Sequence, residues 1–415
     1  MNTHFLFNNI FLRSARTILF AFVFLPLLSF AAERYNPIAV YLTWQHDPTT
    51  TMTIQWITEA NKDEDQVYYQ KVGENSWQIA IGSHSPMPEY EPYLIHKVEL
   101  TDLSPGTSYV FRTGEWNTVP NKFRTIPPNT DTPIRFVVGG DMYRDGIENL
   151  VETHRQAARV DPMFALVGGD IAYAGNKYSV RTSHTQRQRW LTWVIAWNQH
   201  MVTPDGYLIP MIPTIGNHDV NGRYDQTPEQ APFFYSLFSF PGRQGYNALD
   251  FGDFLSIIVL DSGHTHSIDG NQTFWLYNTL EKRQGIPHKF AIYHVPAYPS
   301  VRKFSGKINN EIRKHWVPIF EHFGLTAAFE HHDHAYKRTH PIYKGRVDPR
   351  GVLYLGDGAW GVKKPRKPKK PEKVWFLANT KRAKHFIMVT LEGNNRYFTA
   401  IDSKGNVIDS YSHVQ

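Results

Sequence analysis

The sequence predicts an all-β sandwich followed by an α/β domain, and two patterns lead to this prediction. Residues 34–127 contain short runs in which apolar and polar residues alternate, as they do in half-buried antiparallel strands. From residue 134 onward, unbroken apolar runs end in polar, glycine-bearing turns, and helix-like stretches separate them. Such runs indicate strands buried on both faces, as in sheets covered by helices. The Pro-rich segment 124–133 divides the two patterns.

The N-terminus has the features of a secretory signal peptide. Arg13 and Arg16 precede the apolar run 17–32, and Ser29 and Ala31 supply small residues before a cleavage point. We therefore expect residues 1–31 to be removed and the protein to be secreted or periplasmic. An uncleaved N-terminal anchor is the alternative. No later stretch reaches the roughly 18 apolar residues that a membrane-spanning helix needs.

The chain contains no cysteine. Exported proteins often rely on disulfides, so this fold must depend on its core and on any bound metal. The absence also excludes thiolate nucleophiles and Cys-ligated zinc.

The first region is expected to form a domain over residues 32–127. Apolar side chains alternate in "TMTIQWI", residues 51–57, and again in "HKVEL", residues 96–100. In the following turn, Leu103, Pro105 and Tyr109 resemble the tyrosine corner of fibronectin type III sandwiches. Because no ionisable cluster occurs here, we expect this domain to position or bind rather than to catalyse.

The second region is expected to form the catalytic domain over residues 131–415. Helices are predicted at 146–160 and 186–200, and the tail 386–412 is predicted to form antiparallel strands. Further strands are predicted in seven apolar runs: 134–141, 163–170, 211–219, 254–262, 289–296, 326–334 and 351–361.

Polar residues gather at the ends of five of these strands, where α/β sheets usually place their functional groups. They are Asp141, Asp170, Tyr173, Asn217, His218, His294, His332 and His334. Oxygen and imidazole donors without sulfur suit Fe, Mn, Zn or Mg rather than Cu(I). About seven donors exceed what one ion takes, so the set predicts two metals, with one carboxylate bridging them.

The ordered motifs resemble those of the purple acid phosphatases, in the calcineurin-like metallophosphoesterase superfamily. The motifs are "GGD" ending at 141, "GGDIAY" at 168–173, "GNHD" at 216–219, the strand-end His294, and "HDHAYKR" at 332–338. The resemblance covers nearly all of the mature chain. It implies a fibronectin-type III-like N-terminal domain and an α/β metallophosphoesterase domain of two mixed sheets, packed face to face and flanked by helices.

The resemblance also implies a mechanism and its residues. A hydroxide bound to a dinuclear metal centre would attack a phosphate monoester directly, with no covalent intermediate. Asp141, Asp170, Tyr173 and His334 would hold the first ion, usually Fe(III), and Asp170, Asn217, His294 and His332 a divalent Fe, Zn or Mn. Asp170 would bridge both ions. His218, and Asn217 beside it, would contact the substrate phosphate, with His218 near the leaving group.

Three positions depart from the family pattern. Tyr143 stands where a glycine is usual, and it could crowd the first metal or donate to it. His331 precedes the expected histidine pair, where a glycine is usual, and Asp333 lies between its two members; both could alter the surroundings of the ligands. Arg302 and Lys303 stand near the place of family histidines; they could clamp phosphate as cations but would be poor proton donors at acidic pH.

The formal charge of +6 comes from one segment. The tract "KKPRKPKKPEK", residues 363–373, has seven cations and one acid, and the rest of the mature chain is slightly acidic. We therefore expect no nucleic-acid-binding face. A Lys/Pro run is typically a solvated, extended loop, here capable of weak contact with anionic surfaces.

Two other functions fit the same residues. One is hydrolysis of phosphodiesters or nucleotides on this scaffold. The other is a secreted binding protein whose β domain acts while the metal site is structural or decayed, a reading supported by the three departures. A second His-x-His pair, His264 and His266, lies outside the family motifs and is interpreted as loop residues. The oligomeric state stays open.

Overall fold

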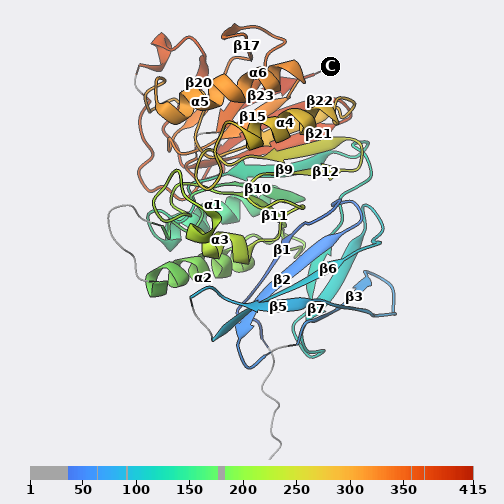
Figure 1. Cartoon of the computed structure of the whole chain (residues 1–415). Helices are drawn as coiled ribbons and strands as arrows, with labels where there is room; N and C mark the ends of the chain where they lie inside the picture. The colour runs from blue at the N-terminus through green and yellow to red at the C-terminus, as the bar shows by residue number, and fades with distance from the viewer. Residues whose placement is uncertain are drawn as a thin grey trace, which may run out of the picture. The chain divides into compact units, whose positions relative to one another are not determined.

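The first strands of the chain form a β-sandwich of two four-stranded antiparallel sheets (Figure 1). The computed structural model describes residues 36–62, 64–89, 92–175, 183–356, 358–368 and 370–414, so the predicted signal peptide lies outside them. One sheet contains, in spatial order, β1 (Ala39–Thr43), β2 (Met52–Glu59), β6 (Tyr93–Leu100) and β5 (Ser83–Pro86). The other contains β4 (Gln78–Ile81), β3 (Gln66–Lys71), β7 (Ser108–Thr113) and β8 (Asn121–Arg124).

The predicted tyrosine corner is present in this sandwich. Tyr109, on β7, is buried and its hydroxyl oxygen accepts the backbone N–H of Ser104 at 2.9 Å. This bond ties the turn to the strand that follows it, as expected for the fibronectin-type arrangement.

Two larger mixed sheets follow. The first has the order β11 (Met211–Thr214), β10 (Phe164–Gly168), β9 (Ile134–Gly139), β21 (His385–Glu392), β22 (Asn395–Asp402) and β23 (Val407–His413). The second has the order β12 (Asn247–Phe251), β13 (Leu255–Val259), β14 (His288–Ile292), β15 (Ala327–Glu330), β19 (Leu353–Gly356), β16 (Tyr336–Thr339) and β20 (Leu377–Lys381). A separate short pair joins β17 (Ile342–Tyr343) to β18 (Arg346–Val347).

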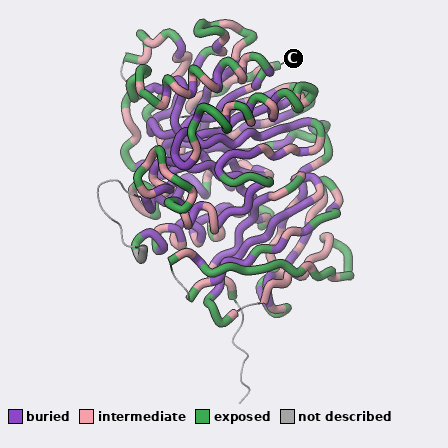
Figure 2. Tube along the Cα trace, in the orientation of Figure 1, coloured by how far each residue is buried: buried purple, intermediate pink, exposed green. Residues whose placement is uncertain are grey.

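The two large sheets pack face to face through aromatic side chains. The ring of Phe136 on β9 lies 5.8 Å from that of Phe290 on β14 and 6.4 Å from that of Phe329 on β15. Most residues of both sheets are buried (Figure 2). This arrangement confirms the predicted fold class.

Helices cover the outer faces of both sheets. The outer face of the first sheet packs against α1 (Ile147–Arg159) and α2 (Ser183–His200), with α3 (Pro232–Leu237) in the same apolar cluster. The second sheet packs against α4 (Asn271–Glu281), α5 (Lys307–His315) and α6 (Val317–His322). Two 3-10 turns, η1 (Pro228–Gln230) and η2 (Pro371–Lys373), complete the elements. The first two helices confirm the helices predicted at 146–160 and 186–200.

The sandwich shares its core with the large sheets. Trp44 makes edge contacts with Phe164 on β10 and Phe251 on β12, at ring distances of 6.1 and 6.0 Å. The hydroxyl of Tyr41 also donates to the carbonyl of Leu237 at 2.7 Å. The domain boundaries at 127 and 131 stay a prediction, because the described residues form one unit from Tyr35 onward. No helix in the described part of the chain combines the length and apolar character needed to cross a bilayer.

Candidate functional site

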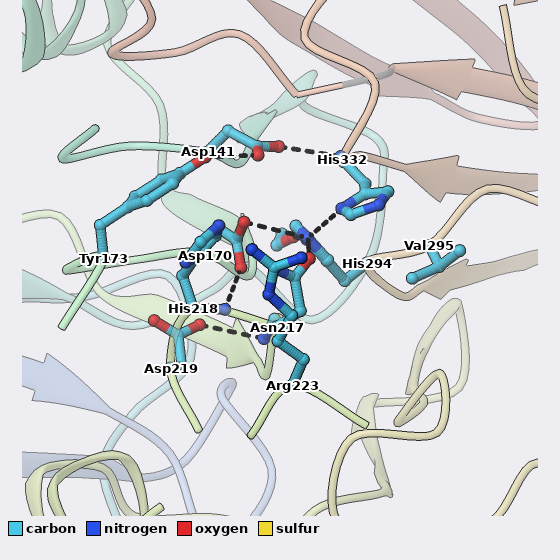
Figure 3. A network of polar contacts seen from close by, with 12 residues as sticks. Asp141, Asp170, Tyr173, Asn217, His218, Asp219, Arg223, His294, Val295 and His332 are labelled. Atoms are coloured by element: carbon cyan, nitrogen blue, oxygen red, sulfur yellow. Dashed lines mark hydrogen bonds and ion pairs between the residues drawn. The ribbon is translucent and has the colours of Figure 1, made fainter. Parts of the chain in front are cut away.

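The polar residues predicted at strand ends lie together at one edge of the two large sheets (Figure 3). Asp141 and Asp170 follow the neighbouring parallel strands β9 and β10, and Asn217 follows β11. From the second sheet, His294 follows β14 and His332 follows β15, which are also parallel neighbours. The carboxyl ends of five strands therefore supply the site, as is general for α/β sheets.

The turns that carry these residues have an unusual backbone. Left-handed φ angles are rare for residues other than glycine and are often maintained at functional sites by the surrounding structure. Five of the predicted ligands have φ between 51° and 75°: Asp141, Asp170, Tyr173, His332 and His334. The backbone thus turns sharply where each of these side chains enters the site.

The first group of predicted metal ligands meets at Asp141. Its Oδ1 atom accepts the Tyr173 hydroxyl at 2.8 Å and lies 2.7 Å from Nε2 of His334. The Tyr173 hydroxyl and Nε2 of His334 are 3.2 Å apart. The other oxygen of Asp141 accepts the backbone N–H of His332 at 2.8 Å, which connects this group to the next.

A second group meets at Nε2 of His294. This atom lies 3.3 Å from Oδ2 of Asp170, 3.3 Å from Oδ1 of Asn217 and 3.1 Å from Nδ1 of His332. Nδ1 of His294 faces the carbonyl of Gly168 at 2.9 Å and therefore has the ring proton when the ring is neutral.

The second group fits a metal ion. With Nδ1 protonated, Nε2 of His294 offers a lone pair, and it faces a carboxylate, an amide oxygen and another imidazole nitrogen. Oδ2 of Asp170 is buried and accepts no hydrogen bond from the described residues. The carboxylate of Asp170 calls for a positive charge at this point, which a proton on Nε2 of His294 or a bound cation can supply, and oxygen and imidazole ligands suit Fe, Zn or Mn.

The charges of these groups depend on one another. Burial opposes ionisation of Asp170, but His294 and His218 outweigh it and hold the pKa of Asp170 well below its usual value. Burial likewise opposes protonation of His294, yet Asp170 raises the pKa of His294 to about 9. For Tyr173, burial and then the carboxylates of Asp141 and Asp170 raise the pKa well above that of an exposed phenol. Without a cation, the phenol therefore stays protonated.

Asp219 connects two of the turns that carry the predicted ligands. Its two oxygens accept the backbone N–H groups of Ile171 at 2.8 Å and Gly216 at 2.9 Å, so it joins the turns after β10 and β11. Burial and the nearby Asp170 raise the pKa of Asp219 to about 8. Asp219 is not among the site residues predicted from the sequence, although it ends the "GNHD" motif.

His218 contacts two of the predicted ligands, one through its backbone and one through its ring. Its backbone N–H donates to Oδ1 of Asp170 at 2.7 Å, and its ring stacks on Tyr173 at 4.6 Å. Nδ1 lies 3.2 Å from the carbonyl of Gly175. Because a carbonyl only accepts, Nδ1 has the proton in the neutral ring and Nε2 is the nitrogen left for a ligand.

His331 fills the space that the two Gly-Gly turns leave. It is buried, and its ring lies so close to Gly140 and Gly168 that a side chain at either glycine would collide with it. Burial lowers the pKa of His331 to about 3, so the ring is neutral. Neither ring nitrogen is hydrogen-bonded within the described residues.

Asp333 has a different role. Its Oδ2 atom accepts the backbone N–H groups of Val301 at 2.7 Å and Arg302 at 3.1 Å. Its Oδ1 atom lies 3.2 Å from Nε of Arg302. Asp333 therefore fixes the loop after β14 and directs the Arg302 guanidinium.

Tyr143 lies outside the two groups of predicted metal ligands. Its ring packs against the apolar cluster around α2 and under the guanidinium of Arg189, 4.2 Å from the ring centre. It is not among the described residues that line the pocket of about 610 Å³ at this site. The expectation that Tyr143 crowds or ligates the first metal finds no support in this placement.

A pocket of about 610 Å³ opens onto both groups of predicted metal ligands. Four arginines line it, and Lys303 does not. Among the described residues, the lining consists of Arg144, Asp145, Asp170, Tyr173, Asn217, His218, Arg223, Tyr224, Arg302, His332, His334 and Arg366.

Arg366 corrects the prediction for the basic tract. Lys363, Lys364 and Lys367 are exposed, as a solvated loop requires. Arg366 is instead half-buried, and its backbone N–H donates to the carbonyl of His334 at 2.8 Å. This bond holds the tract against the site, so one of its cations belongs to the pocket.

The second His-x-His pair lies in a loop, as expected, but His264 is fully buried. Its Nδ1 donates to the carbonyl of Arg223 at 2.8 Å and its ring stacks on Tyr224 at 5.1 Å. His266 pairs with Asp261 at 3.4 Å. His264 therefore supports two residues of the pocket lining.

Two family descriptions match the chain. "Purple acid phosphatase, N-terminal domain" matches residues 37–125, and "calcineurin-like phosphoesterase" matches residues 134–336.

The chain is similar to curated phosphatases. Purple acid phosphatase 21 of Arabidopsis thaliana is 26% identical over 292 residues, which are 67% of this chain and 63% of that protein. Purple acid phosphatase 15 of Arabidopsis thaliana is 25% identical over 65% of this chain, and the match spans only 54% of that protein. Acid phosphatase type 7 of Mus musculus is 22% identical over 417 residues, 90% of each chain.

Solved structures share the fold. The structure of a purple acid phosphatase from yellow lupin (Lupinus luteus) seeds superposes with a TM-score of 0.73 at 17% identity, over 90% of this chain and 73% of that one. The structure of PhoD superposes with a TM-score of 0.65 at 12% identity, over 92% and 94%. Because both domain descriptions match and the named relatives are purple acid phosphatases, the chain belongs to the purple acid phosphatase-like members of the calcineurin-like phosphoesterases.

Proposed function

We propose that this protein hydrolyses phosphate monoesters at a dinuclear metal centre. The observation that supports this most directly is the division of the predicted ligands into two contact groups. Asp141, Tyr173 and His334 contact one another, while Asp170, Asn217, His294 and His332 meet at one imidazole nitrogen. These groups correspond to the two ligand sets that the family resemblance implies, with Asp170 as the proposed bridge.

The bound ions would supply Lewis-acid activation of a water molecule and neutralise the phosphate charge. We assign Fe(III) to the group that contains Tyr173, because a phenolate is a hard donor. A divalent Fe, Zn or Mn is assigned to the group around His294.

The protein's own residues would orient the substrate and move a proton. The arginines of the pocket would pair with phosphate oxygens of the substrate. Asn217, a neutral ligand, would place no negative charge beside the phosphate. When protonated, Nε2 of His218 would deliver its proton to the leaving oxygen, a role typically worth about 10²- to 10⁴-fold in rate.

The alternative of a secreted binding protein with a decayed site has less support. Tyr143 and His331, two of the departures that suggested decay, are not among the described residues that line the pocket. The third, at Arg302, supplies a cation to the pocket. Export through a cleaved signal peptide at residues 1–31 is part of the proposal.

The test uses the mature protein from Ala32 onward, purified without chelators. Two metal ions per chain and release of p-nitrophenol from p-nitrophenyl phosphate at acidic pH are expected. Asp170→Asn should lose metal and activity together; its amide oxygen can still accept the backbone N–H of His218, so the turn should persist. Activity that is retained in this variant would contradict the proposal, and so would a wild-type protein inactive after addition of iron, zinc or manganese.

A further inference from the structure

Four separate segments each contribute one arginine to the pocket. Arg144 follows β9, Arg223 follows β11, Arg302 follows β14, and Arg366 comes from the basic tract. The acidic residues in the lining are Asp145 and the proposed ligand Asp170. The pocket is therefore strongly cationic around the metal-binding groups, beyond what the ligand set requires.

Two of these arginines converge on one atom. The carbonyl oxygen of His332 accepts from the guanidinium of Arg302 at 3.3 Å and from that of Arg366 at 3.5 Å. The two donor nitrogens therefore lie within about 7 Å of each other. A phosphate group presents several oxygens and can accept from two guanidiniums at such a separation.

Both arginines are anchored, Arg302 through its side chain and Arg366 through its backbone. Asp333 pairs with Nε of Arg302, and the backbone N–H of Arg366 is bonded to the His334 carbonyl at 2.8 Å. Burial, followed by the nearby charge of Arg302, lowers the pKa of Arg366, which reflects two cations placed close together. An anion between them would relieve this repulsion.

The pair lies next to the metal-binding groups rather than within them. The ring of His332 faces His294, and the carbonyl of His332 accepts from the arginines. The arginine pair and the predicted metal ligands therefore lie on either side of His332. The volume of about 610 Å³ is in the range of pockets that hold drug-sized ligands. There is room for more than one phosphate group.

We propose that Arg302 and Arg366 form a subsite for a second phosphate, so that preferred substrates have a phosphate adjacent to the one that is hydrolysed. This inference rests on the proposed function. The neighbouring phosphate can be joined through an anhydride, as in a nucleoside diphosphate, or through a separate ester on the next carbon.

The test compares kcat/KM for two matched pairs of substrates. ADP against AMP probes the anhydride-linked case, and 2,3-bisphosphoglycerate against 3-phosphoglycerate probes the ester-linked case. At least one bisphosphate should be preferred over its monophosphate by tenfold or more. Equal use of both members in both pairs would overturn the subsite while leaving the phosphatase activity established.

Variants then locate the subsite. Arg366→Gln and Arg302→Gln should each lower the preference for the bisphosphate at least fivefold. Lys364→Gln is the matched control, because Lys364 is an exposed cation of the same tract outside the pocket lining. A preference that survives in both arginine variants, or that falls equally in the control, would overturn the assignment.

A binding measurement separates this inference from the proposed function. Calorimetric titration of the metal-loaded protein with the α,β-methylene analogue of ADP needs no turnover. The dissociation constant should rise about tenfold in Arg366→Gln. If the wild type hydrolyses nothing but shows this difference, the subsite stands and the phosphatase proposal fails; equal affinities would overturn the subsite.

Discussion

Nε of Arg302 lies 3.2 Å from Oδ1 of Asp333, and the other oxygen of Asp333 accepts the backbone N–H of Arg302 at 3.1 Å. Asp333 is fully buried, whereas 40% of the Arg302 side chain is exposed to the pocket and solvent. A buried carboxylate thus orients a cation that is open to ligands. This relationship gives a role to the aspartate within the His331–His334 cluster.

Asp333→Asn should weaken substrate binding more than turnover. The amide keeps an oxygen for the backbone N–H groups of Val301 and Arg302 but loses the charge that orients the guanidinium. We expect KM for the preferred bisphosphate substrate to rise about tenfold, which corresponds to about 1.4 kcal/mol, with kcat changed less. Asp348→Asn is the control, because Asp348 pairs with Arg350 outside the pocket lining. An unchanged KM would contradict the role given to Asp333.

Tyr173→Phe should remove a visible absorption band if the first ion is ferric. The phenol oxygen, 2.8 Å from Asp141, is the proposed source of phenolate-to-iron charge transfer. Tyr336→Phe provides a matched control, because Tyr336 is a buried tyrosine that donates to Asp409 at 2.6 Å outside the pocket lining. Absorption spectra of both variants, with iron content measured in parallel, decide the point. A band that persists in Tyr173→Phe would contradict this assignment.

His218→Gln should show its largest effect on substrates with poor leaving groups. Nitrophenolate leaves without a proton, whereas an alkoxide needs one from Nε2 of His218. We expect kcat for glycerol phosphate to fall about 10²- to 10⁴-fold and kcat for p-nitrophenyl phosphate to fall much less. Equal losses for both substrates would assign His218 to phosphate binding instead of proton transfer.

His154 should make the fold sensitive to acid. It is fully buried, its Nδ1 accepts the indole N–H of Trp360 at 3.0 Å, and burial lowers the pKa of His154 to about 3. The unfolded pKa is about 6.5, so the unfolded state binds more protons between pH 6.5 and about 3. Stability from this group is complete above pH 6.5 and declines as the pH falls, by about 2 kcal/mol at pH 5.

His154→Gln removes this dependence. The variant is expected to be less stable than the wild type at pH 7, because it loses a hydrogen-bonded ring that makes edge contacts with Trp197 and Trp360. The difference between the two proteins should shrink by about 2 kcal/mol at pH 5. Urea unfolding at both pH values measures it, and titrations common to both proteins cancel. A difference that is constant with pH would show that His154 is not the responsible group.

The ligand set was predictable because each member ends or follows an apolar run. Asp141, Asp170, Asn217 and His294 stand at strand ends, and parallel strands bring such ends to one edge. Their pairwise contacts were not predictable from spacing, since Asp141 and His334 meet across 193 positions in the chain. The resemblance supplied that grouping before any geometry did.

Three of the four pocket arginines could not be predicted in the same way. Arg144, Arg223 and Arg366 lie in loops, where no periodicity reports which way a side chain points. Arg366 is placed by a backbone bond to the His334 carbonyl, a tertiary contact that leaves no mark on the composition of the tract. The composition of this lysine- and proline-rich run therefore predicted a solvated loop throughout, although Arg366 lines the pocket.

The pairing of β9 with β21 determines when the metal site can form. The strand that leads to Asp141 has β10 on one side and β21 on the other, and β21 begins at His385. During synthesis, β9 therefore waits for nearly 250 further residues before its second neighbour exists. Long-range pairing of this kind delays folding. Metal insertion should accordingly follow completion of the chain, and a ribosome-arrested fragment that ends before β21 should retain no iron, even though every proposed ligand has already been made.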